Sequence, residues 1–296
     1  MGNTHAPVNG VLLIDKPAGP SSNAVLQRAK RLLGAARAGH TGTLDPLASG
    51  LLVIALGEAT KFSGGILDAD KSYRARLKLG ERTETGDAEG PVVSRAEVKV
   101  TRNGLLAALE RYRGEIEQLP PAYAAIKHLG RPLYAYARRG EHVPRAARRV
   151  AIRRLELEKF EGNTVALFVE CSKGTYIRAL AEDIGADLGC GAHLAELERI
   201  AVGPFALRQS MTLEALEAIS PAERRERLLP LEAFLQSWPR LTLDAPLAAK
   251  FRQGRTIAVD CASGSIAVFA EDAKFLGTGQ VDAGGTLQPK RLLALS

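Results

Sequence analysis

The densest set of residues that could do chemistry lies between Gly39 and Gly50, in the segment Gly-His-Thr-Gly-Thr-Leu-Asp-Pro-Leu-Ala-Ser-Gly. Its titratable side chains are His40 and Asp45. The glycines and the proline precede an apolar run, which predicts a tight polar loop set against buried structure. Taken alone, Asp45-Pro46 predicts a helix N-cap followed by proline at the first helical position. A catalytic role for Asp45 therefore requires a partner from elsewhere in the chain.

Arg178 is the candidate partner. The turn Lys173-Gly174 precedes a helical pattern, and if Thr175 caps this helix, Arg178 lies in its first turn. A positive charge there opposes the helix dipole, and a local rule broken without local gain often marks a functional site. The Asp45 carboxylate would compensate this charge, and the pair would keep Asp45 ionised. The alternative is a surface arginine that reaches into water.

Other reactive side chains have ordinary structural roles as their default. Tyr73 lies on the apolar face of an alternating strand, where core packing is expected. Tyr176 is compatible with packing at the entry of the helix, and Cys171 is predicted to be a small buried hydrophobic residue. Aromatic rings near a carboxylate and a basic segment are also what an enzyme that flips a base out of RNA requires.

The positive charge of the chain is concentrated in one segment. The protein has 40 lysines and arginines against 33 aspartates and glutamates, which is a net charge of +7. Residues 121–160 hold ten basic side chains, eight of them arginine, against three acidic ones, so this segment accounts for the whole excess. Arginine grips phosphate and stacks on bases, and three tyrosines are interleaved here, which favours RNA binding. A solvated surface is the alternative.

Several other classes of function are disfavoured. The apolar run Leu51–Leu56 is far shorter than the roughly 20 residues that cross a bilayer, and the first residues lack a signal pattern. A cytoplasmic protein without a membrane span is therefore expected. Three scattered cysteines and five dispersed histidines predict neither disulfides nor a metal site. The sequence has no phosphate-loop, dinucleotide-binding or serine-hydrolase motif.

The elements that must position these residues mix helices and strands without regular alternation, which predicts an α+β fold. A short strand over 11–14 is followed by a helix that Ser21-Ser22 caps and Gly34 ends. Alternating, probably antiparallel strands are predicted over 71–79 and 165–171, and a helix follows the second one as far as Gly189. After Trp238-Pro239, short β-like runs separated by glycines indicate a small β-rich domain.

The loop from Gly39 to Gly50 resembles the catalytic motif of the TruB family of tRNA pseudouridine synthases, bacterial enzymes that isomerise uridine 55 in the T loop. Further blocks resemble the family in family order, from residue 15 to about residue 205. These blocks are Asp15-Lys16-Pro17 with Ser21-Ser22, Lys71-Ser72-Tyr73, Thr83-x-Thr85-x-Asp87, Pro120-Pro121-x-Tyr123 through Lys127, Cys171 to Arg178, and Gly189 to Leu194. The resemblance implies a pseudouridine-synthase domain over 1–238, with a central mixed, largely antiparallel sheet flanked by helices, and a PUA-like RNA-binding domain over 239–296.

The resemblance also implies roles for individual residues. Asp45 would be the catalytic nucleophile, Arg178 its ion-pair partner and Tyr73 the ring that stacks on the flipped base. The nucleotide pocket would also be shaped by His40, Tyr176 and Leu197. A basic insertion over about 121–155 would clamp the T arm, and the RNA backbone would be contacted by Arg145, Arg148 and Arg149.

The implied reaction conserves bonds and redox state, so no cofactor and no metal are expected. The predicted partner is the T stem-loop of tRNA, and the chain is expected to act as a monomer without an obligatory protein partner. Two alternatives stay open. One is a tRNA-binding or folding module, against which the intact set of Asp45, Tyr73 and Arg178 argues. The other is a guide-RNA-dependent relative, a class that usually lacks a long basic insertion of its own.

Three positions depart from the commonest family pattern. Ser49 stands where threonine is usual, and it keeps a hydroxyl. Ala125 stands where serine often follows the tyrosine. Glu198 stands where an arginine commonly precedes Arg199, and it reverses a charge near the expected pocket.

Overall fold

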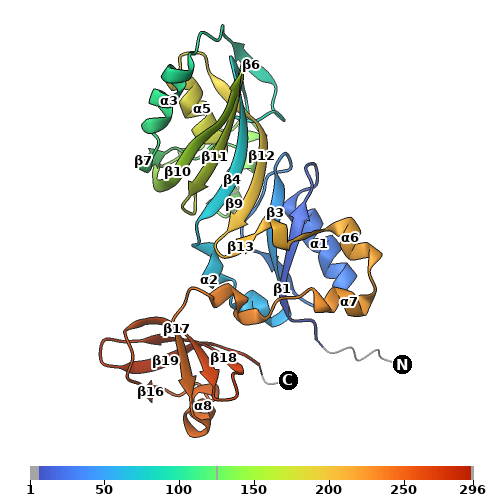
Figure 1. The fold of residues 1–296 in the computed structure, drawn as a ribbon, viewed down its shortest axis with the longest axis vertical. Coiled ribbons are helices and arrows are strands. Elements are labelled where there is room, and N and C mark those ends of the chain that lie inside the picture. The colour runs from blue at the N-terminus through green and yellow to red at the C-terminus, as the bar shows by residue number, and fades with distance from the viewer. Residues whose placement is uncertain (1–6, 125, 295–296) are drawn as a thin grey trace.

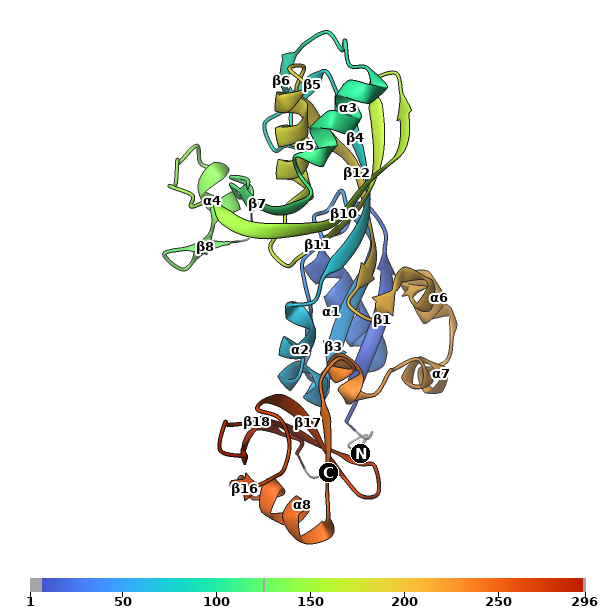
Figure 2. The same cartoon turned by 60° about the vertical axis from the view of Figure 1, so that its left-hand side comes forward.

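The computed structural model describes residues 7–124 and 126–294, so the departure at Ala125 lies outside the described residues. The molecule is elongated, with a large sheet at one end and a smaller C-terminal sheet at the other (Figures 1 and 2). Helices and strands follow one another without regular alternation, and the α+β fold predicted from the sequence is confirmed. None of the described helices combines the length and apolar character needed to cross a membrane.

A mixed sheet of ten strands forms the framework of the described residues before 213. Most neighbouring strands are antiparallel, whereas β1 with β14 and β3 with β12 are parallel. The order along the sheet is β14-β1-β3-β12-β4-β11-β10-β7, with β2 beside β3 and β13 beside β12. The strands are β1 (Gly10–Lys16), β2 (Ala38–His40), β3 (Ser49–Leu56), β4 (Lys71–Leu79), β7 (Gly114–Gln118), β10 (Arg148–Glu161), β11 (Thr164–Cys171), β12 (Ala192–Val202), β13 (Phe205–Ala206) and β14 (Met211–Thr212).

The middle of this sheet is buried on both faces. Alternate residues of β3 contact two different apolar clusters, Leu51, Val53 and Ala55 on one face and Leu52, Ile54 and Leu56 on the other. Strands that are covered on both faces have nearly continuous apolar sequences. The apolar run after the polar loop is therefore a central strand, and it provides a rigid base for that loop.

Helices cover the two halves of the sheet. α1 (Ser22–Leu33) packs on β1 and β3, and it begins and ends as predicted, with Ser21 as N-cap and Gly34 in the left-handed conformation after its last turn. α5 (Ile177–Asp187) and α3 (Arg102–Glu110) pack together on β4, β10 and β11 (Figure 2). Shorter helices are α2 (Gly64–Leu67), α6 (Leu213–Ala218), α7 (Pro221–Glu226), η1 (Gly57–Lys61), η2 (Leu207–Gln209) and η3 (Leu231–Leu235).

Two small hairpins extend from the large sheet. One is formed by β5 (Glu81–Thr83) and β6 (Val92–Arg95), and the other by β8 (Lys127–His128) and β9 (Arg131–Pro132), followed by α4 (Leu133–Ala137). The second hairpin and α4 project from the sheet between β7 and β10 (Figure 2). The predicted insertion over 121–155 is too long at its end, because residues from Arg148 onward pair with β7 and then β11 as part of β10.

The C-terminal residues form a separate five-stranded sheet in the order β15-β17-β18-β19-β16. The β-rich character predicted for this part of the chain is confirmed, whereas its helix, α8 (Ala245–Arg252), was not predicted. The strands are β15 (Arg240–Leu243), β16 (Ile257–Ala258), β17 (Gly264–Ala270), β18 (Phe275–Val281) and β19 (Thr286–Leu292).

An aromatic cluster joins the small sheet to the large one. Phe269 and Phe275, from β17 and β18, belong to the same buried cluster as Phe62, Phe205 and Phe234. The Phe62 and Phe275 rings meet edge to face, with their centroids 5.0 Å apart. Such contacts between large apolar side chains stabilise the orientation of the two sheets.

We expect Phe275→Ala to lower the free energy of unfolding by about 3 kcal/mol, because it leaves a cavity in this shared cluster. Urea unfolding followed by circular dichroism measures the change. Leu129→Ala is the matched control, because Leu129 is 86% exposed and its truncation should change stability by less than about 0.5 kcal/mol. A loss below 1 kcal/mol for Phe275→Ala would show that the two sheets do not stabilise each other.

Candidate active site

A pocket of about 360 Å³ lies where the loop between β2 and β3 meets β4, β12 and the turn before α5. Five of the residues predicted from the sequence line it, namely Asp45, Tyr73, Tyr176, Arg178 and Leu197. His40 lies half-buried on β2 and is not among the lining residues. The structure therefore brings together all but one of the predicted pocket residues.

A larger cleft of about 1260 Å³ lies between the end of α1, residues 7–9 and α7. Within the described chain its lining has no aromatic ring on which a base could stack, and its carboxylate, Glu58, is paired with Lys61. The smaller pocket combines a carboxylate, aromatic rings and cations. It is therefore the candidate active site.

Asp45 lies in a turn rather than at the start of a helix. The N-cap predicted for Asp45-Pro46 is wrong, because the Ala48 amide donates to the Asp45 carbonyl (3.1 Å) and the chain enters β3 at Ser49. The strand is favoured over a helix because the following residues pair with β1 and are buried on both faces.

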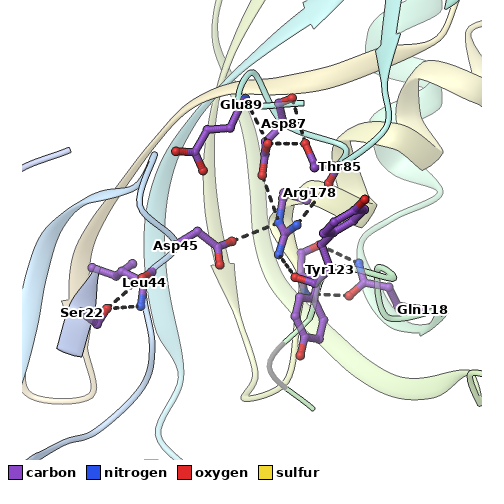
Figure 3. Close-up of polar contacts among 10 residues, drawn as sticks. Ser22, Leu44, Asp45, Thr85, Asp87, Glu89, Gln118, Tyr123 and Arg178 are labelled. Atoms are coloured by element: carbon purple, nitrogen blue, oxygen red, sulfur yellow. Dashed lines mark hydrogen bonds and ion pairs between the residues drawn. The ribbon is translucent and has the colours of Figure 1, made fainter. Parts of the chain in front are cut away.

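The loop is bound to its surroundings on both sides of Asp45. The Ser22 hydroxyl accepts from the Leu44 amide and donates to the Leu44 carbonyl, each at 2.8 Å (Figure 3). The buried ammonium of Lys16 donates to the Ala48 carbonyl (2.6 Å), and burial lowers its pKa to about 8. These bonds satisfy buried backbone groups and hold the loop in one conformation.

Arg178 is the ion-pair partner of Asp45. Its Nε lies 3.0 Å from Asp45 Oδ2, so the structure contains the pair expected from the sequence, and 3.6 Å from Asp87 Oδ2 (Figure 3). The guanidinium also donates from Nη1 to the Thr85 carbonyl (3.1 Å) and from Nη2 to the Tyr123 carbonyl (3.0 Å). Its side chain is only 5% exposed. Contacts on both sides of its planar fork therefore fix its orientation.

The first turn of α5 places Arg178 in the site. Thr175, the predicted cap, is not the N-cap; Tyr176 is, and the Thr175 hydroxyl donates to the Ser172 carbonyl instead. Gln118 binds the N-cap residue, because its Oε1 accepts from the Tyr176 amide (2.7 Å) and its Nε2 donates to the Tyr176 carbonyl (3.0 Å). A side chain from β7 thus satisfies one of the free amides at the helix entry.

The charge of Asp45 depends on opposing influences. Burial raises the pKa of its carboxyl above the usual 3.8, the Arg178 guanidinium lowers it, and the Asp87 carboxylate raises it. The Asp45 side chain is still 41% exposed to the open pocket, so solvent moderates the effect of burial. Arg178 is therefore the main group that favours the ionised carboxylate, and Lys16 adds to its effect.

Two tyrosines give the pocket its aromatic walls. Burial raises the pKa of the Tyr73 hydroxyl, and the Arg199 guanidinium opposes the rise. Burial also raises the pKa of Tyr176, against the opposing charges of Arg148 and Arg178. Both side chains are therefore neutral at neutral pH, and each offers a ring face to a ligand.

Several residues of the site have no role predicted from the sequence. Lys71 and Arg199 line the pocket, and Asp87 contacts Arg178. The alternation of β12 was the available signal for Arg199, because residues two apart on a strand share a face and Leu197 lies on this one. By the same alternation Glu198 lies on the other face, opposite Arg74, so its reversed charge is directed away from the pocket.

The three arginines predicted to contact RNA are exposed, and they lie just before β10 or in its first two residues. Arg145 donates from Nη1 to the Pro120 carbonyl (2.8 Å), which limits its freedom. Arg148 pairs with Gln118 across β7 and β10, and its charge acts on Tyr176. Arg149 is the next residue of the strand and so faces the opposite side of the sheet.

The acidic residues of the site do not form a metal centre. Among residues 7–124 and 126–294, no group of three or more histidine, cysteine, aspartate or glutamate side chains has the arrangement of metal ligands. Asp45 and Asp87 instead share the Arg178 guanidinium.

We expect Arg178→Met to raise the pKa of the Asp45 carboxyl further, because the substitution removes the charge that lowers it and leaves burial and Asp87. The fraction of ionised Asp45 at a given acidic pH should then fall. A pH titration of selectively ¹³C-labelled aspartate, with Asp45→Asn to assign the signal, measures the shift. An unchanged or lower pKa would show that the ion pair does not control the charge of Asp45.

Comparison with protein families covers nearly all of the chain. Residues 30–177 match the TruB family pseudouridylate synthase N-terminal domain, and residues 178–236 match the tRNA pseudouridylate synthase B C-terminal domain. Residues 239–293 match the C-terminal domain of pseudouridine synthase II TruB.

Individual relatives agree with these matches. The tRNA pseudouridine synthase B of Aromatoleum aromaticum is 54% identical over 97% of this chain and 93% of its own length. That of an Azoarcus species is 54% identical over 97% of this chain and 95% of its own length.

Among solved structures, a chain in a Cbf5-Nop10-Gar1 complex has a TM-score of 0.74 at 25% identity, covering 96% of this chain and 84% of that one. A chain in an H/ACA RNP bound to a substrate RNA containing 2'-deoxyuridine has a TM-score of 0.73 at 24% identity, covering 97% and 85%. The latter likeness is one of fold. Together with the family matches and the high identity of the bacterial relatives, the pocket leads to one conclusion: the chain belongs to the TruB family of pseudouridylate synthases, which are isomerases.

Proposed function

We propose that this protein isomerises uridine 55 in the T loop of tRNA to pseudouridine, with Asp45 as the nucleophile. The observation that carries this proposal is the Asp45–Arg178 ion pair, 3.0 Å long, at a pocket that Tyr73 also lines. The substrate class is supported by relatives named tRNA pseudouridine synthase B, which are 54% identical over nearly the whole chain.

The residues of the pocket suit this reaction. The bond between uracil N1 and ribose C1′ breaks, the base turns, and C5 bonds to C1′, while C5 loses a proton and N1 gains one. Asp45, kept ionised by Arg178, adds to the base or to C1′ and so retains the fragments while the base turns. The neutral ring of Tyr73 and the apolar side chain of Leu197 give a flipped base two surfaces. The reaction conserves atoms and redox state, so the proposal requires no cofactor.

RNA binding is assigned to two surfaces in this proposal. The first is the basic segment that starts at residue 121, in which Arg148 lies close enough to Tyr176 of the pocket to act on its pKa. The second is the C-terminal sheet, the PUA-like domain predicted over 239–296. The division of the chain at 238 and 239 belongs to the same proposal, as do the roles predicted for His40 and Tyr176 in shaping the nucleotide pocket.

We expect Asp45→Asn to abolish isomerisation while tRNA binding survives, because the amide keeps the shape of the side chain but is not a nucleophile. Tritium release from C5-labelled uridine in a tRNA transcript, together with filter binding, measures both. Asp183→Asn is the matched control, since Asp183 lies on the exposed side of α5 outside this pocket. Tritium release by Asp45→Asn at the wild-type rate would contradict the assignment.

The same assay separates the rival functions. Isomerisation of a bare transcript by the purified chain supports a stand-alone enzyme. A protein that binds tRNA without forming pseudouridine would be a binding or folding module. Activity that appears only with a guide RNA and further subunits would assign the chain to the guide-dependent class.

We expect Arg148→Ala to weaken tRNA binding and to reduce the slope of log K against log salt by about 1, the effect of one lost phosphate contact. Arg149→Ala should leave the slope unchanged, because Arg149 faces the other side of the sheet. The two variants remove the same charge from adjacent positions, so each controls for the other. Equal slopes for both variants would contradict a phosphate contact confined to the pocket side.

A further inference from the structure

Arg199 is a buried charge whose role the proposed reaction leaves unexplained. It is the largest fully buried side chain of the described residues, with 1% of its surface exposed. In that part of the chain it has no carboxylate within ion-pair distance, and burial lowers the pKa of its guanidinium while the Tyr73 side chain opposes that effect. Burying a guanidinium without a counter-ion is costly in free energy, which points to a functional role for its contacts.

The guanidinium of Arg199 joins the two ends of the Asp45 loop. Its Nη2 donates to the Gly42 carbonyl (3.1 Å), three residues before Asp45, and its Nε donates to the Leu51 carbonyl (2.8 Å), six residues after it. A planar fork with several donors can hold two carbonyls at fixed separation. One side chain from β12 thus sets the span of the loop.

Two glycines of the loop motif lie close to Arg199. A Cβ atom on Gly50, whose φ is +97°, would lie 2.4 Å from the Arg199 carbonyl oxygen. A Cβ atom on Gly42, whose φ is +127°, would lie 3.4 Å from Arg199 Nη1. Both backbone angles favour glycine, and at position 50 the close approach of the Arg199 backbone leaves no room for a Cβ atom. The Asp45 loop and β12 are therefore closely packed at Arg199.

Arg199 also lies beside Tyr73. The two residues are directly opposite each other on the antiparallel strands β12 and β4, so their side chains share a face, and both line the pocket. The Arg199 guanidinium interacts with the Tyr73 hydroxyl and opposes the rise that burial causes in its pKa. Arg199 thus connects the aromatic wall of the pocket to the loop that carries Asp45.

We propose that Arg199 is a positioning residue for the isomerisation, which orients the Tyr73 hydroxyl and the Asp45 loop as one unit. This inference rests on the proposed function. A residue that acts through Tyr73 should lose most of its effect when the hydroxyl is absent, whereas a residue that only stabilises the fold should not. The two roles are separated by a double-mutant cycle.

The experiment measures single-turnover pseudouridine formation at saturating enzyme, with tRNA affinity and melting temperature, for wild type, R199K, Y73F and the double variant. In the wild-type background R199K should slow isomerisation about 30-fold, with tRNA affinity changed by less than about twofold, because it alters preorganisation rather than binding. In the Y73F background the factor by which the same substitution slows isomerisation should be at least about fivefold smaller.

R224K is the matched control, because Arg224, like Arg199, donates to backbone carbonyls, in its case three, but lies on α7, outside the pocket. R224K should lower the melting temperature without slowing isomerisation by the folded enzyme. Equal losses from R199K in the two backgrounds, or a loss confined to tRNA affinity, would overturn the proposal. If R199K fails to fold, R199Q, which still has an amide donor, takes its place in the cycle, and failure of both to fold would make Arg199 a structural residue and overturn it. Absence of pseudouridine with the wild-type protein would instead refute the proposed function.

Discussion

A carboxylate and a guanidinium that lie 3.0 Å apart in a largely desolvated place impose the main constraint on this protein. Arg178 is almost fully buried, and a buried cation is tolerated only when its charge is balanced and its donors are satisfied. Asp45 and Asp87 balance the charge, while the Thr85 and Tyr123 carbonyls accept from its terminal nitrogens. The result is a carboxylate that is fixed in position and still open to the pocket, with Arg178 opposing the rise that burial causes in its pKa.

The fold meets this constraint because side chains from strands and helices bind the backbone of the segments that carry the site. The Asp45 loop has no regular secondary structure, yet Ser22, Lys16 and Arg199 bind its backbone from three different elements. The first turn of α5 has no side-chain cap, and Gln118 of β7 binds the backbone of its N-cap residue, Tyr176. Sites supported by such contacts keep their geometry better than sites on unsupported loops.

The large sheet explains how these contacts are possible. The parallel pairing of β3 with β12 places the end of the loop against Arg199, and the antiparallel pairing of β4 with β12 places Tyr73 on its other side. The aromatic cluster around Phe275 then fixes the C-terminal sheet at the far end of the same framework (Figure 1). The Asp45 loop, the Tyr73 ring and the first turn of α5 are therefore all positioned by one continuous sheet.

The sequence by itself determined the features that depend on near neighbours. The alternation of residues 71–79 identified β4, and the capping residues Ser21 and Gly34 identified the ends of α1. The positive charge of Arg178 in the first turn of a helix indicated an acidic partner. Resemblance of the motif blocks identified the family and most of the residues that line the pocket. The signals for β4 and α1 lie within a few residues of the elements that they predict.

Only the tertiary structure decided the features that depend on distant residues. The turn at Asp45 stands in place of the expected helix because β3 pairs with β1, and the N-cap residue Tyr176 is bound by Gln118 from 58 positions away. Arg199 contacts Leu51 across 148 positions. Local propensity differs by less than a few kcal/mol between alternatives, so strand pairing and the satisfaction of buried polar groups determine the outcome.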